Sequence, residues 1–145
     1  MNTTHSTKQS TRIERAEPGI LPAWCKAGAT VAIATGSRET AVRLAAVAAV
    51  NTRYVTLDNG DRYSITKGLT EIGERSAFAL VPFLADPKSY AVKYAQAIAR
   101  RDALQYRVSK AHDEFQLRPS RGSAAALQGA IGHWAGQVAK IAVHF

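Results

Sequence analysis

The segment Asp58-Asn59-Gly60 constrains the fold of this chain more than any other part of its sequence. These turn residues lie between two short runs rich in β-branched and aromatic residues, and such a pattern indicates a β-hairpin. A two-residue loop of Asn59 and Gly60 would pair Leu57 with Arg62 and so mix apolar and polar side chains on one face. A three-residue loop with Gly60 in the left-handed conformation avoids this mixing.

The three-residue loop separates the hairpin into an apolar face and a polar face. It pairs Val55 with Tyr63, and both fall on the apolar face. A one-residue shift of register sends every side chain to the opposite face. We therefore predict the register that keeps apolar and polar side chains on separate faces. The apolar face then holds Val55, Leu57, Tyr63 and Ile65, and the polar face holds Tyr54, Thr56, Arg62 and Ser64.

Three further strands are predicted around the hairpin, over residues 30–35, 41–50 and 76–83. In the second of them, Val42, Leu44 and Val50 should share one side, with Arg43 and Val47 on the other. The third should end at Pro82, since proline is tolerated only at an edge or strand end. Five short strands with tight turns predict a small, strongly bent β-barrel.

The apolar period changes to a helical one after residue 85. Asp86-Pro87 has the capping oxygen and the proline typical of a helix start, and Pro119 should stop the helix near Leu117. A second helix should begin near 120–123. The chain is therefore predicted to be an α+β protein, with a disordered polar tail at 1–12, a lead-in segment and barrel at 13–85, and an antiparallel helical hairpin at 86–145. Polar residues interrupt the last apolar stretch, which argues against a membrane span.

The charge of the chain favours polyanionic partners. The net charge is +8, and half of this excess lies between Pro87 and Pro119. Two groups of residues are candidates for nucleic-acid binding. One is a ridge on the first predicted helix, where a cation recurs every seven residues at Lys93, Arg100 and Arg107; the other is the polar side of the barrel, with Arg43, Arg53, Tyr54 and Arg62. A solvated charged surface is the alternative for the first group, and cover by the helical hairpin is the alternative for Tyr54.

The second predicted helix has a face of small residues, comprising Ala125, Gly129, Gly132 and Gly136. Glycine disfavours a helix by roughly 1 kcal/mol relative to alanine, so this face suggests the close approach of another backbone. The barrel, a second copy of the chain or another protein could supply that backbone. We therefore consider it a candidate protein-partner face.

Catalytic, metal and cofactor chemistry has little support in the sequence. The four histidines are dispersed, and Cys25 is the only cysteine, which suits a reducing compartment and excludes an internal disulfide. We expect Cys25 to be a small apolar core residue beside Trp24. The glycines lie singly at turns rather than in a phosphate-binding loop. The prediction is a non-catalytic binding protein without metal or cofactor.

The order of these features resembles small accessory proteins of tailed phages, particularly those of actinobacterial hosts. The features are Pro22 and Trp24, the strand Arg53-Tyr54-Val55-Thr56, the Asn59-Gly60 turn, and Leu80-Val81-Pro82 leading into Asp86-Pro87. The resemblance implies an SH3-like or KOW-like barrel and a host-takeover or regulatory role in the host cytoplasm. Two hypotheses follow: binding to nucleic acid or a ribonucleoprotein, or inhibition or adaptation of a host protein through the helical hairpin.

Overall fold

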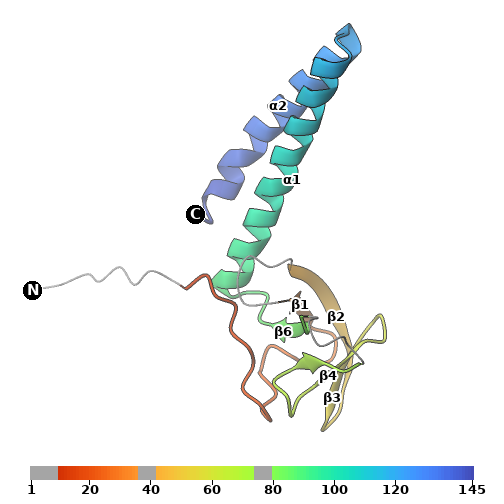
Figure 1. Cartoon of the computed structure of the whole chain (residues 1–145). Helices are drawn as coiled ribbons and strands as arrows, with labels where there is room; N and C mark the ends of the chain where they lie inside the picture. Colours follow the sequence, from red (N-terminus) through yellow and green to blue (C-terminus); the bar gives the residue numbers. More distant parts are fainter. Residues whose placement is uncertain (1–9, 36–41, 74–79) are drawn as a thin grey trace, which may run out of the picture. The chain divides into compact units, whose positions relative to one another are not determined.

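The computed structural model describes residues 10–35, 42–73 and 80–145 (Figure 1). Within these ranges, six strands precede two helices. They are β1 (Thr30–Ala34), β2 (Val42–Val50), β3 (Tyr54–Leu57), β4 (Arg62–Ser64), β5 (Thr70–Glu71), β6 (Phe83–Ala85), α1 (Tyr90–Leu117) and α2 (Arg121–Ala142). The chain divides into two compact units, Met1–Ala95 and Gln96–Phe145.

The strands of the first unit form an antiparallel sheet that closes into a barrel, because β1 pairs with β2 on one side and with β6 on the other. The predicted small barrel followed by two helices is thus confirmed, but the described part of the chain has six strands where five were expected. The extra strand is β5, whose two residues are too few to produce a recognisable alternation.

The strand predicted at 76–83 is wrong in its described part. Residues 76–79 lie outside the described residues, and 80–82 are not in a strand. β6 begins at Phe83, directly after Pro82, which has no N–H to donate to the sheet. The Pro82 carbonyl still accepts a hydrogen bond of 2.9 Å from the Glu71 N–H, so the proline lies where the strand starts rather than where it ends.

The central hairpin has the predicted loop and register. Val55 lies opposite Tyr63, and the Leu57 N–H donates to the Asp61 carbonyl across a loop of three residues. Gly60 has a φ of 91°, in the left-handed region that glycine favours. The Asn59 side chain fixes the loop by accepting from the Asp61 N–H at 2.9 Å.

The predicted faces of β2 are correct up to Val47 and wrong for Val50, because the strand contains a β-bulge. Val47 lies opposite Leu57 but Ala49 lies opposite Thr56, so one extra residue is inserted between them. Val47 is buried in the core, and Val50 also packs against it although it is three residues away. Leu44 is 52% exposed, on the outside of the barrel.

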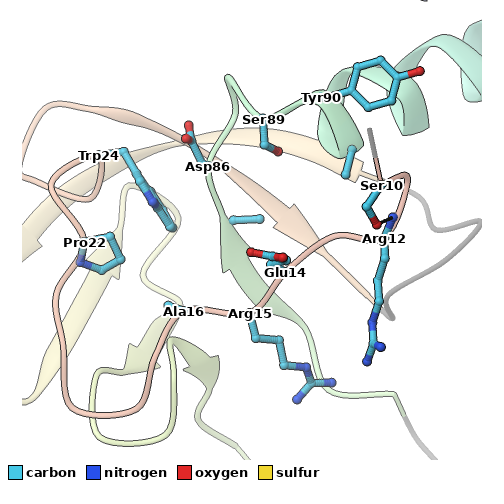
Figure 2. Close-up of a pocket in the computed structure, with 12 residues that line it drawn as sticks. Ser10, Arg12, Glu14, Arg15, Ala16, Pro22, Trp24, Asp86, Ser89 and Tyr90 are labelled. Carbon is cyan, nitrogen blue, oxygen red and sulfur yellow. Dashed lines mark hydrogen bonds between the residues drawn. The ribbon is translucent and has the colours of Figure 1, made fainter. Parts of the chain in front are cut away.

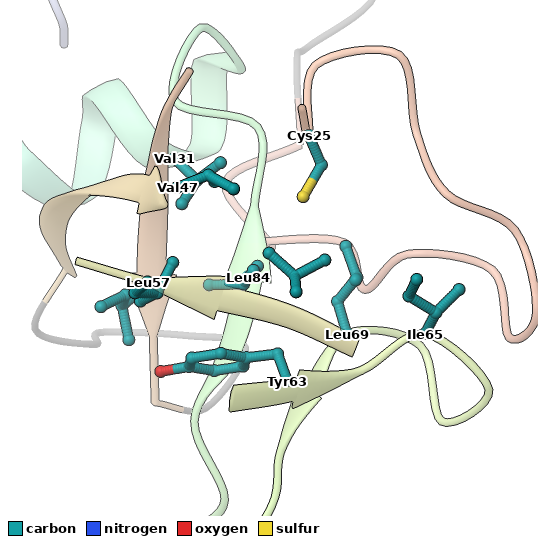
Figure 3. Packing of buried hydrophobic residues seen from close by; sticks show 10 residues of the cluster. Cys25, Val31, Val47, Leu57, Tyr63, Ile65, Leu69 and Leu84 are labelled. Carbon is teal, nitrogen blue, oxygen red and sulfur yellow. The ribbon is translucent and has the colours of Figure 1, made fainter. Parts of the chain in front are cut away.

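Figure 3 shows the barrel core, in which the four apolar residues of the hairpin meet side chains from the other strands and the lead-in segment. Cys25 is buried there, as predicted, and burial raises the pKa of its thiol to about 11. Tyr63 is also fully buried, and its hydroxyl donates to Glu71 Oε2 at 3.3 Å. Burial, and then the charge of Glu71, raises the pKa of this phenol.

A second buried cluster joins the start of α1 to the barrel. Ile13 of the lead-in segment packs there with Phe83 of β6 and Val92 of α1. The helix starts later than predicted, because its N-cap is Ser89 rather than Asp86: the Val92 N–H donates to Ser89 Oγ at 3.3 Å. Asp86 instead accepts from the Lys88 N–H in the preceding turn.

In the second unit, the rest of α1 and α2 lie side by side and antiparallel (Figure 1). Ala97, Leu104 and Ile141 form its buried cluster, with Trp134 packed against them. Ser120 and Ser123 form a reciprocal capping box at the start of α2. The helix therefore starts where the sequence predicted, near 120–123. Among the described residues, no helix has the length and apolar character needed to cross a membrane.

Candidate nucleic-acid interface

The polar face of the hairpin presents an aromatic ring with a guanidinium group stacked on it. Tyr54 lies opposite Ser64, and Arg62 is two residues before Ser64 on β4. This diagonal arrangement brings the Arg62 Cζ atom to 5.4 Å from the centroid of the Tyr54 ring. The Tyr54 ring is half-buried and Arg62 is exposed, so the face can meet a flat, electron-rich ligand such as a nucleobase.

A groove of about 280 Å³ runs beside Tyr54. Lys67 lines it together with Ser64 and Thr70, and the Thr70 hydroxyl donates to the Lys67 carbonyl. Glu71 also lines the groove, where it accepts the Tyr63 hydrogen bond. The groove thus adds one cation, two hydroxyl groups and one carboxylate to the aromatic pair.

Arg53 flanks Tyr54 and is exposed. The turn that carries it is fixed by Asn51, whose side-chain oxygen accepts from the N–H groups of Arg53 at 2.8 Å and Tyr54 at 2.6 Å. Tyr54 and Arg62 therefore lie together on one face of the hairpin, whereas Arg53 lies in the turn directly before β3. Lys67 was missed because it lies in a tight turn after β4, outside the alternating pattern.

Arg43 does not join this group. It lies opposite Ile33, whose side chain is in the barrel core, and directly opposed residues of antiparallel strands share a face. Its charge acts on the Tyr63 phenol, where it lowers the pKa against the larger effects of burial and Glu71. Arg43 is thus on the opposite side of the sheet from Tyr54 and Arg62.

The three predicted helix cations are all exposed. Lys93 belongs to the first unit, whereas Arg100 and Arg107 belong to the second. Among the described residues, none of the three has an ion-pair partner; the acid nearest in sequence to Arg100, Asp102, is held by Arg101 at 3.1 Å. Their charges are therefore available to a ligand.

A second pocket of the first unit, of about 400 Å³, lies between the lead-in segment and the start of α1 (Figure 2). Arg12 and Arg15 line it, but so do Glu14 and Asp86. The Arg15 guanidinium is also placed 4.8 Å from the Phe83 ring centroid. Two acids offset the two arginines here, whereas Arg62 and Lys67 outnumber Glu71 at the hairpin face, so this pocket suits a polyanion less well.

The small-residue face of α2 is open. Ala125 is exposed, and a Cβ added at Gly129, Gly132 or Gly136 would have no atom within 4 Å. Within the second unit, α1 does not cover this face. The predicted partner surface is therefore accessible.

No three His, Cys, Asp or Glu side chains of the described residues are grouped as a metal site would require. No protein-family model, curated protein or solved structure matches the chain. The resemblance to phage accessory proteins stays a prediction.

Proposed function

We propose that the protein is a non-catalytic nucleic-acid-binding factor whose hairpin face stacks an unpaired base. The single observation that supports this is the Arg62 guanidinium stacked on Tyr54 beside a groove that contains Lys67. Aromatic and guanidinium planes together bind bases and phosphates of single strands without needing a fixed sequence. The net charge of +8 favours the same class of partner.

The exposed cations of α1 would add phosphate contacts. Arg100 and Arg107 have no ion-pair partner among the described residues, so their binding to phosphate would displace no internal salt bridge. In keeping with the predicted family resemblance, we propose that the protein acts as a phage accessory factor in the host cytoplasm, on nucleic acid or a ribonucleoprotein.

The experiment is a titration of the protein with mixed-sequence single-stranded RNA and DNA. Tyr54→Leu keeps the bulk of the side chain but removes the stacking surface, and base stacking contributes about 1–3 kcal/mol, so affinity should fall roughly 5- to 150-fold. Tyr54→Phe should bind like wild type. Equal affinities for the Leu and Phe variants would contradict base stacking at Tyr54.

Two charge variants distinguish binding at the hairpin face from a general effect of the net charge. Arg62→Gln and Arg12→Gln each remove one positive charge from an exposed arginine of the first unit. If the hairpin face is the site, Arg62→Gln should weaken binding clearly more than Arg12→Gln does. Equal losses would indicate a non-specific effect of overall charge.

A second candidate function, binding to a host protein as an inhibitor or adaptor, is favoured by a different observation. The face of α2 that holds the open glycines is exposed, and Val143, directly after the helix, is 79% exposed. Exposed apolar surface of this kind commonly marks a protein interface. The helical hairpin would be the binding element.

A further inference from the structure

The helical hairpin is incompletely packed. Its buried cluster lies at one end, at Ala97, Leu104 and Ile141, and no residue from 105 to 140 is buried. Two helices can contact each other along only one seam, so the side chains beside the seam remain open unless a further element covers them. This leaves most of the hairpin without a core of its own.

One side of this open seam is a groove of about 570 Å³ between α1 and α2. Ala111 of α1 and Ala126 and Ala130 of α2 line it with methyl groups. Such small side chains allow the backbone of a third helix to come close. The groove is therefore apolar along the seam.

The charges at the groove lie on α1. Arg107 and Lys110 line it next to Tyr106, which is 66% exposed, and Glu114 follows one turn after Lys110. α2 contributes only Ser123 and alanines. An occupant would thus meet two cations, then one acid, along one side and apolar surface along its centre.

We propose that this groove binds an amphipathic, acidic helix of a partner protein, which completes a three-helix bundle. The helix would place small or apolar residues on the alanines and acidic residues against Arg107 and Lys110, with a basic residue at the level of Glu114. This inference deepens the second candidate function by stating the chemistry of the partner.

Two other occupants fit less well. A second copy of the chain pairs the groove cations poorly, because its α2 contains no Asp or Glu and its α1 carries five cations against three acids. Nucleic acid would place phosphates against methyl groups and against the carboxylate of Glu114. Charge complementarity therefore favours the acidic helix.

The test uses the full chain and a fluorescent peptide of about three heptads, with Ala and Leu on one stripe and Glu on its flanks. The comparison peptide carries Lys in place of every Glu. To avoid dependence on weak affinity, the acidic peptide is also joined to the C-terminus by a flexible linker, which raises its effective concentration. Hydrogen exchange of residues 105–140 should then slow, because these helices gain cover.

Matched variants assign binding to the groove. Ala126→Leu fills the groove and should weaken binding of the acidic peptide by about tenfold or more. Ala135→Leu lies nine residues later, on the opposite side of α2, and should leave that binding unchanged. Arg107→Glu with Lys110→Glu should reject the acidic peptide and accept the lysine peptide. Binding of mixed-sequence RNA should be unchanged in Ala126→Leu, which separates this proposal from the nucleic-acid one.

Three results would overturn the proposal. One is unchanged hydrogen exchange in the linked protein, and another is equal binding of the acidic and lysine peptides. The third is RNA binding that is lost in Ala126→Leu, because the groove would then hold nucleic acid.

Discussion

Single residues with unusual backbone angles set local limits on this fold. Gly60 has a φ of 91° at the hairpin loop, and Gly68 has a φ of 67° in the turn before β5. They differ in surroundings. A Cβ added at Gly60 would have no atom within 4 Å, whereas at Gly68 it would lie 2.7 Å from the Ala16 carbonyl oxygen. Gly68 therefore lets the lead-in segment approach the barrel.

This difference predicts unequal costs for the same substitution. Gly60→Ala should lower the free energy of unfolding by about 1–2 kcal/mol, through left-handed strain alone. Gly68→Ala should cost at least about 1 kcal/mol more, because its Cβ also displaces backbone. Denaturant unfolding of both variants measures this. Equal midpoints would show that the lead-in segment moves away without cost.

Two buried groups that lose a proton at high pH, the Cys25 thiol and the Tyr63 phenol, predict a loss of stability at alkaline pH. The pKa of Cys25 is raised from 9.0 to about 11, and that of Tyr63 is raised above its ordinary value of 10.0, chiefly by burial. Above pH 9 the unfolded chain thus binds fewer protons than the folded chain, so the free energy of unfolding falls as pH rises. Between pH 9 and 11 it should fall more steeply for wild type than for the double variant Cys25→Ala/Tyr63→Phe.

The comparison rests on the slope of unfolding free energy against pH, since the variants also lose packing at neutral pH. Unfolding in denaturant at several pH values between 7 and 11 supplies it. Parallel curves for wild type and variant would mean that neither group shifts between the two states. Slow reaction of Cys25 with a thiol reagent at neutral pH is the accompanying control.

At the scale of elements, sequence patterns predicted what local periodicity encodes. The β3–β4 register followed from the alternation of apolar and polar residues around Gly60, and the helical seam from apolar residues at helical spacing. β5 and β6 could not be predicted in the same way. β5 has two residues, and β6 has three fully buried residues that do not alternate.

The bulge in β2 explains the other error. An inserted residue between Val47 and Ala49 changes which side chains face the core, and nothing in a run of alanines and valines marks its position. The candidate site shows the same limit of prediction from sequence patterns. Tyr54 and Arg62 were predictable from alternation, whereas Lys67 and the groove at Tyr106 and Lys110 depend on turns and on helix packing.

The open glycine face of α2 supports a further prediction. Gly132→Leu should keep or raise the stability of the chain, by up to about 1 kcal/mol, because leucine is the better helix former and nothing in the protein obstructs its Cβ. Circular dichroism and denaturant unfolding measure this. A marked loss of stability would mean that this face is packed against another part of the chain. If the face binds a partner, the same variant should lose that partner.

At the scale of the whole molecule, the positive charge predicts salt-dependent binding. If Lys93, Arg100 and Arg107 contact phosphates, affinity for mixed-sequence nucleic acid should fall with salt by a log–log slope of about −0.7 to −0.9 per contact. Changing all three to Gln should flatten the slope by about 2 to 3 units. Thermal stability should change little, since exposed charges contribute little to folding.

Titrations at several salt concentrations give the slope for both proteins. A triple variant that changes three exposed cations outside this set, Arg12, Lys26 and Arg118, to Gln removes the same charge elsewhere. If both triple variants flatten the slope equally, the three helix cations have no special role. If wild type does not bind at low salt, the protein-binding function becomes the better proposal.

The closure of the barrel by β1 and β6 also determines when the barrel can form. The paired residues of these strands are about 50 positions apart, whereas β3 and β4 meet across a three-residue loop and α1 and α2 are neighbours in sequence. Non-local pairings form slowly, so the central hairpin and the helices should assemble before the ring does. Until β6 arrives, β1 presents an unpaired edge and its buried side chains to other chains. The interval before Phe83–Ala85 docks is therefore the period in which this protein is most prone to aggregate.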